Sequence, residues 1–198
     1  MEMVENLKAR GHDIIVLTST YGEDRVRSEG DVYRWQMLRF ERAVNWRDGV
    51  LKEAINQAAF RRACEEFVPE VVFLWNMSHI SISLAAMAHE MGLATCYYVF
   101  DNWLATWEMD HWCQLWRQKG NGLYHLFLKF LSRKFRLIVP PFSLDMSSAV
   151  FASCYLKGVA LKNGKPVEGA SVVHWGIDIN KFPYQSTDSR AANRLLYV

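Results

Sequence analysis

No apolar run in this 198-residue sequence is long enough to cross a bilayer, although 51% of the residues are hydrophobic. A membrane-spanning helix needs about 20 predominantly apolar residues in a row. Residues 1–7 include Glu2 and Glu5 and hold no apolar stretch, so we predict no signal peptide. These features favour a protein that is either soluble or attached to a membrane surface.

Paired cysteines and a strong net charge are also lacking. The four cysteines are widely spaced and form no C-x-x-C pair, a pattern typical of reduced thiols in the cytoplasm. The net charge of +2 gives no indication of nucleic-acid binding. The run from Asp110 to Cys113 contains three possible metal ligands but not the paired spacing of a structural zinc site. We therefore predict a cytoplasmic protein with no metal and no nucleic-acid partner.

The stretch 70–103 is the most informative part of the chain. Residues 71–75 form a short apolar run, which predicts a strand buried on both faces. Helical spacing follows over 80–91, with Ser78 as a candidate N-cap and Gly92 at the left-handed C-terminal position. A second buried strand is predicted over 95–100. Strand, helix and strand with short joints predict a right-handed β-α-β unit.

Polar residues follow both predicted strands of this unit. Asn76 and Ser78 follow the first strand, and Asp101, Asn102 and Trp103 follow the second. Parallel strands bring these exits to one edge of the sheet, where open α/β sheets bind their ligands. We expect the functional site there.

The remaining segments alternate in the same way. In the predicted helix 50–67, one side carries Leu51, Ile55, Ala58, Ala59, Arg62 and Ala63. Apolar strand or core segments are predicted at 14–17, 32–38, 137–139, 149–152, 172–175 and 195–198, and short helices at 3–10 and 155–161. The pattern predicts an α/β fold.

Several short motifs occur in a particular order along the chain. They are Arg10-Gly11-His12 before a strand, Pro69-Glu70-Val71-Val72 at a strand entry, Phe100-Asp101-Asn102-Trp103, an S-x-x-x-K segment from Ser153 to Lys157, and Val172-Val173-His174-Trp175-Gly176-Ile177-Asp178 with Phe182 after it. In this order they resemble the amino-terminal half of retaining glycosyltransferases of family 4, which have the GT-B architecture. The resemblance covers nearly the whole chain.

The resemblance implies a Rossmann-like parallel sheet with helices on both faces. Residues 1–184 would form the acceptor-side domain, and 185–198 the linker and the start of a donor-binding domain. A first strand with a glycine-rich loop would precede Met3. Without that strand, we expect the strands at 14–17 and 71–75 each to have an unpaired edge. Most donor contacts would lie in the second half, so we expect the 198-residue chain alone to be inactive.

The resemblance also implies roles for individual residues. Asp101 would be catalytic, although Phe100 stands where the family commonly has a histidine before this aspartate. The acceptor-binding residues would be Tyr21, Gly22, Asn76, Ser78, Asn102 and Trp103. The residues on the donor or phosphate side would be Ser153, Lys157 and Gly176. No cofactor is implied, because the nucleotide sugar, a UDP- or GDP-sugar, is a substrate.

Each of these residues has a structural alternative. Asp101 can close an Asx-turn, and Ser78 can simply cap a helix. Trp103 is the best candidate to stack on a sugar ring, whereas Trp75 lies within a strand and is assigned to the core. The other tryptophans in this region, Trp107, Trp112 and Trp116, are assigned to the core by their helical spacing. Lys157 can be an ordinary solvated lysine, and Gly176 can shape a turn.

The segment 116–136 combines aromatic and basic residues. No acidic residue occurs between Asp110 and Asp145. Such a segment can lie on an anionic membrane at the cytoplasmic face, or it can be an ordinary surface helix over the sheet.

These observations lead to two hypotheses. The first is the acceptor-side domain of a nucleotide-sugar-dependent glycosyltransferase that transfers a hexosyl group to a glycan or lipid-linked acceptor. The alternative is a truncated or degenerate non-catalytic α/β module that binds a glycan or protein partner.

Overall fold

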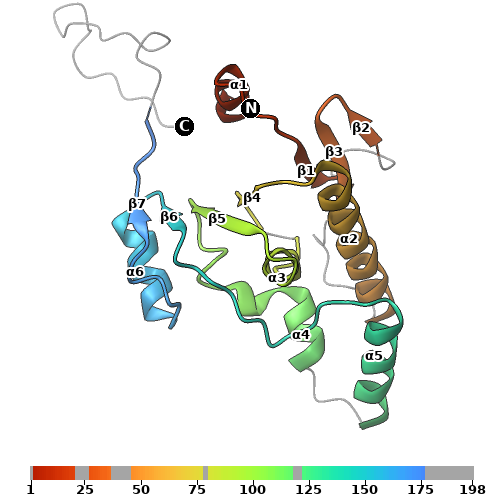
Figure 1. The fold of residues 1–198 in the computed structure, drawn as a ribbon. Helices are drawn as coiled ribbons and strands as arrows, with labels where there is room; N and C mark the ends of the chain where they lie inside the picture. Colours follow the sequence, from red (N-terminus) through yellow and green to blue (C-terminus); the bar gives the residue numbers. More distant parts are fainter. Residues whose placement is uncertain (1, 21–26, 37–45, 78–79, 118–121, 177–198) are drawn as a thin grey trace, which may run out of the picture.

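A computed structural model describes residues 2–20, 27–36, 46–77, 80–117 and 122–176 (Figure 1). Its elements are α1 (Glu2–Ala9), β1 (Val16–Ser19), β2 (Arg27–Glu29), β3 (Val32–Gln36), α2 (Trp46–Phe67), β4 (Val71–Leu74), α3 (Ser83–Glu90), β5 (Ala94–Val99), η1 (Trp107–Met109), α4 (His111–Arg117), α5 (Gly122–Lys134), β6 (Ala149–Phe151), α6 (Cys154–Lys162) and β7 (Ser171–Val172). Helices and strands alternate, so the α/β class is confirmed. The predicted joint at 184–185 lies outside the described residues.

The strands form two sheets. β4, β5, β6 and β7 form a four-stranded sheet in that order, and every neighbouring pair is parallel. β3 lies between β1, which is parallel to it, and β2, which is antiparallel. Within the described residues β1 and β4 are each at the edge of a sheet. The parallel four-stranded sheet is compatible with a Rossmann-like fold.

The β-α-β unit begins and ends close to the predicted residues, with one change at its helix. Gly92 has φ of +72°, which confirms it as the left-handed residue that ends α3. α3 starts only at Ser83, later than expected. Ser81, whose Oγ accepts from the Ser83 N–H at 3.2 Å, supports this start. Ser78 lies outside the described residues.

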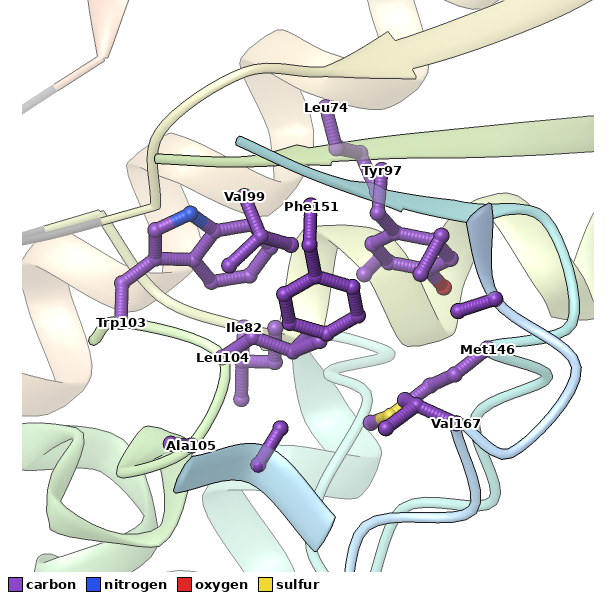
Figure 2. Packing of buried hydrophobic residues seen from close by; sticks show 14 of the residues in the cluster. Leu74, Ile82, Tyr97, Val99, Trp103, Leu104, Ala105, Met146, Phe151 and Val167 are labelled. Atoms are coloured by element: carbon purple, nitrogen blue, oxygen red, sulfur yellow. The ribbon is translucent and has the colours of Figure 1, made fainter. Parts of the chain in front are cut away.

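One face of the four-stranded sheet carries the largest core cluster (Figure 2). Leu74, Tyr97, Val99 and Phe151 point from the strands toward side chains of α3, α4 and α6 and of the loop after β5. The neighbouring residues along β4 point the other way, because side chains alternate along a strand. Phe73 is 43% exposed and Trp75, directly after β4, is 40% exposed. The predictions that this strand is buried on both faces and that Trp75 is a core residue are therefore wrong.

Of the residues named on one side of α2, only Ala63 is buried. Leu51 and Ile55 are exposed, while Glu53, Asn56 and Gln57 are fully buried. Gln57 explains part of this, because its side chain donates to Ile138 O at 3.0 Å and accepts from Ile138 N at 2.7 Å. Val50, Phe60 and Cys64 are buried on the same side, so apolar packing and these hydrogen bonds together hold it inward. Among the described helices, none has the length and apolar content to span a membrane.

Candidate functional site

The carboxyl ends of β4 to β7 lie at one edge of the sheet, because the four strands are parallel. Asn76 follows β4 and Asp101 follows β5, and Asn76 Nδ2 donates to Asp101 Oδ2 at 3.3 Å. Ser153 follows β6, and His174 follows β7 with its Nδ1 3.0 Å from Ala152 O. The structure therefore brings Asn76 and Asp101 together at the predicted edge, and Ser153 follows the next strand at that edge.

Asp101 is half-buried and accepts hydrogen bonds at both carboxylate oxygens. Besides the bond from Asn76, Oδ1 accepts from the Trp103 N–H at 2.8 Å, which is an Asx-turn. The Asx-turn, which is the structural alternative for Asp101, is therefore formed. A carboxylate has about four lone-pair sites, so two donors leave acceptor capacity for a ligand hydroxyl.

The two residues after Asp101 are placed differently from each other. The side chain of Asn102 is exposed. The backbone carbonyl of Asn102 accepts a hydrogen bond from Thr106 N at 3.1 Å. Trp103 is only 7% exposed, with its ring centroid 6.4 Å from that of Tyr97 (Figure 2). Trp103 is therefore a core residue, and burying its large indole in an apolar cluster is strongly favourable. An open stacking surface at Trp103 is not what the structure shows.

The S-x-x-x-K segment opens helix α6. Ser153 is its N-cap, and Oγ accepts from Leu156 N at 3.2 Å. Lys157 Nζ donates to Glu168 O and to Ala170 O, both at 2.7 Å, and so holds the loop before β7 against the helix. An ammonium group has three protons, so one donor of Lys157 is left for another acceptor. A role toward the donor phosphates stays a prediction for both residues.

The other predicted site residues give less information. Gly176 is exposed, and a Cβ built on it would meet nothing within 4 Å, so no close approach requires glycine there. Tyr21, Gly22 and Ser78 lie outside the described residues, as do Ile177, Asp178 and Phe182.

A cluster of aromatic rings lies beside the polar exits and was missed in the sequence. The ring of Trp75 lies 5.1 Å from that of Tyr98 and 6.0 Å from that of Phe100. Phe100 in turn lies 5.9 Å from Trp175, which is 65% exposed. Strand alternation could have found part of this cluster, since Phe73 and Trp75 share a face, as do Tyr98 and Phe100. That this face is open could not be read from the alternation.

A hollow of about 300 Å³ lies between η1, α4 and residues 140–142. It is lined by Trp107, Cys113, Trp116, Arg117, Pro140, Pro141 and Phe142. Within the described part of the chain, Nε1 of Trp107 and of Trp116 has no hydrogen-bond partner.

Burial raises the pKa of the Cys113 thiol to about 12, with a smaller contribution from Asp110, so this thiol is a poor nucleophile. Trp112 belongs to the core as predicted and donates from Nε1 to Ile138 O at 2.9 Å.

A buried polar network joins α2 to α3. Glu53 Oε1 accepts from Gln57 Nε2 at 2.7 Å and also from the Ser83 hydroxyl. Nearby, Gln36 at the end of β3 donates to Asn56 O at 3.2 Å. Hydrogen bonds offset the cost of burying polar groups, and these bonds connect β3 to α2 and α2 to α3. Across the described ranges, no group of three or more His, Cys, Asp or Glu residues could hold a metal ion.

Comparison with known protein families, curated proteins and solved structures finds no match to this chain. The resemblance to family 4 glycosyltransferases therefore stays a prediction.

Proposed function

We propose that this chain is the acceptor-side, Rossmann-like domain of a nucleotide-sugar-dependent glycosyltransferase that transfers a hexosyl group to a glycan or lipid-linked acceptor. The observation that carries the proposal is the contact between Asn76 and Asp101 at the carboxyl edge of a parallel sheet. Ligands of open α/β sheets bind at this edge. The order of sequence motifs supports the choice of reaction class.

Asp101 is the residue we assign to the acceptor hydroxyl. The Trp103 N–H and Asn76 hold the carboxylate in place. It is therefore already oriented before a ligand binds, and binding needs little further loss of its conformational entropy. An ionised carboxylate accepts hydrogen bonds and can take up the proton of a hydroxyl that attacks the donor sugar. The donor, a UDP- or GDP-sugar, is a substrate, and the proposal includes no cofactor.

The exposed rings of Trp75 and Trp175 supply the apolar part of the acceptor site. Flat aromatic rings pack against the C–H face of a sugar, while hydroxyls at its rim hydrogen-bond to polar side chains. Both rings are linked through Phe100, the residue directly before Asp101. We assign sugar stacking to these two tryptophans in place of the buried Trp103.

Saturation-transfer NMR with a panel of glycans tests this assignment on the 198-residue chain. We expect sugar-ring signals with the wild type, a loss of most of the signal in Trp75→Ala/Trp175→Ala, and a several-fold reduction in Asp101→Asn. The asparagine keeps an oxygen for the Asx-turn but loses the charge. Tyr155→Ala, at a 74% exposed position on α6, is the matched aromatic control and should leave the signal unchanged.

Glycan binding that survives all of these substitutions, or no glycan binding at all, would contradict the acceptor edge and favour a module that binds a partner elsewhere. Calorimetry with UDP- and GDP-hexoses should give no heat of tight binding, because the resemblance implies that most donor contacts lie in another domain. Micromolar donor affinity together with sugar transfer would show that the chain also has a donor site.

A further inference from the structure

The outward side of helix α5 is apolar. Leu123, Leu126, Phe127 and Phe130 are 79%, 66%, 45% and 59% exposed. A surface helix of a globular protein normally places polar residues on its outer face and apolar residues on the face toward the core. α5 has apolar residues on both sides, so its outer side needs an explanation beyond packing on the domain.

Contacts on the inner side of α5 hold this orientation. Leu128 is fully buried in a cluster with Val50 and Trp112, and Leu131 packs against the same cluster. Phe127, which is 45% exposed, lies between the two sides, and its ring meets that of Trp46 edge-on at 5.4 Å. α5 is therefore packed against α2 and α4 (Figure 1). The outer apolar residues of α5 are exposed because the helix packs on the domain through its opposite face.

Basic residues flank the exposed apolar residues. Lys129 and Arg133, one turn apart, lie along one side of these residues, Lys134 follows Phe130 by one turn at the end of the helix, and all three are exposed. The sequence has no acidic residue from 111 to 144. The basic residues of this range are Arg117, Lys119, Lys129, Arg133, Lys134 and Arg136. The surface that meets α5 should therefore be apolar at its centre and negatively charged around it.

An anionic bilayer surface has this combination. Amphipathic segments with leucine and phenylalanine on one face and flanking lysine and arginine bury the apolar face at the boundary between headgroups and acyl chains. Each basic residue near such a surface adds about a fivefold gain in partitioning, from about 1 kcal/mol per charge. A second copy of the chain fits less well, because α5 has three basic residues and no acidic one, so pairing two copies of this helix would bring positive charges together without a counter-charge.

We propose that α5 lies flat on an anionic phospholipid membrane, with Leu123, Leu126 and Phe130 inserted and Lys129, Arg133 and Lys134 at the headgroups. The proposal requires neither a nucleotide sugar nor an acceptor. Its test is therefore independent of the glycosyltransferase assignment.

Sedimentation of the 198-residue chain with vesicles tests the proposal. The vesicles contain phosphatidylcholine alone or phosphatidylcholine with about one third phosphatidylglycerol. We expect binding to the anionic vesicles, weakening with added salt because surface charges are screened over about 8 Å at physiological ionic strength. Lys129→Gln/Arg133→Gln should lower partitioning about thirtyfold, the product of two charges. Leu126→Ser/Phe130→Ser should abolish binding at all salt concentrations.

Matched variants elsewhere on the surface are the controls. Arg10→Gln/Lys162→Gln changes the formal charge by the same amount at two exposed positions outside α5, and Tyr155→Ser/Val173→Ser removes two exposed apolar side chains. Both should bind like the wild type. Equal binding to neutral and anionic vesicles would overturn the proposal. So would a loss of binding in Arg10→Gln/Lys162→Gln as large as that in Lys129→Gln/Arg133→Gln. So would a wild-type dimer that does not bind vesicles and that Leu126→Ser/Phe130→Ser converts to a monomer.

Discussion

The two faces of the β4–β7 sheet come from the same strands but have different surroundings. On one face Tyr97, Val99 and Phe151 are fully buried under α3, α6 and the loop after β5. On the other face Phe73 and Trp75 are exposed, and the ring of Trp75 contacts those of Phe73 and Tyr98. Residues next to each other in the chain thus have opposite roles, one stabilising the fold and the other available to a ligand or partner. The experiments below would break or sharpen this difference.

Thiol reactivity should show the largest contrast. Burial raises the pKa of Cys113, in the core of the packed face, to about 12, so the thiol form dominates below that pH. At about pH 8 roughly one molecule in ten thousand carries the thiolate at Cys113. Alkylation with iodoacetamide, followed by mass spectrometry, should modify the exposed Cys154 long before Cys113. In denaturant the two cysteines should react at similar rates, and equal rates in the folded protein would contradict the buried position of Cys113.

Truncation of a packed-face side chain should have the next largest effect. Phe151→Ala removes a fully buried ring and should lower the free energy of unfolding by about 3–5 kcal/mol. Phe73→Ala removes the same atoms from the open face, and we expect a loss of about 1 kcal/mol or less. Urea denaturation of both variants measures the difference. Similar losses would mean that the Phe73 face is covered in solution.

Loss of the helix cap should have the smallest effect. Ser153→Ala removes the oxygen that accepts from Leu156 N at the start of α6, which covers the packed face. We expect a loss of about 1 kcal/mol in the free energy of unfolding. Ser153→Asp should restore most of it, because aspartate caps helices as well as serine does. A full effect of Ser153→Ala that aspartate does not restore would point to a different role for the hydroxyl.

The polar interior of α2 shows where sequence patterns were misleading. The spacing of Leu51 and Ile55 matches a helix that packs by those residues, yet Glu53, Asn56 and Gln57 are buried in their place. Gln57 can be buried because it bonds to both backbone groups of Ile138, a residue 81 positions away. Hydrophobic periodicity does not register such a partner, since it weighs each side chain without its long-range hydrogen bonds.

The sequence by itself determined the α/β class, the β-α-β unit with its glycine C-cap, and the meeting of Asn76 and Asp101 at one edge. These follow from local periodicity, from turn chemistry and from the rule that parallel strands end at the same side of a sheet. Only the tertiary structure decided that Trp103 is buried, that Trp75 is exposed and that α5 keeps four apolar residues outside. Alternation along a strand or helix divides side chains into two sides. Which side is covered depends on elements that are distant in the chain.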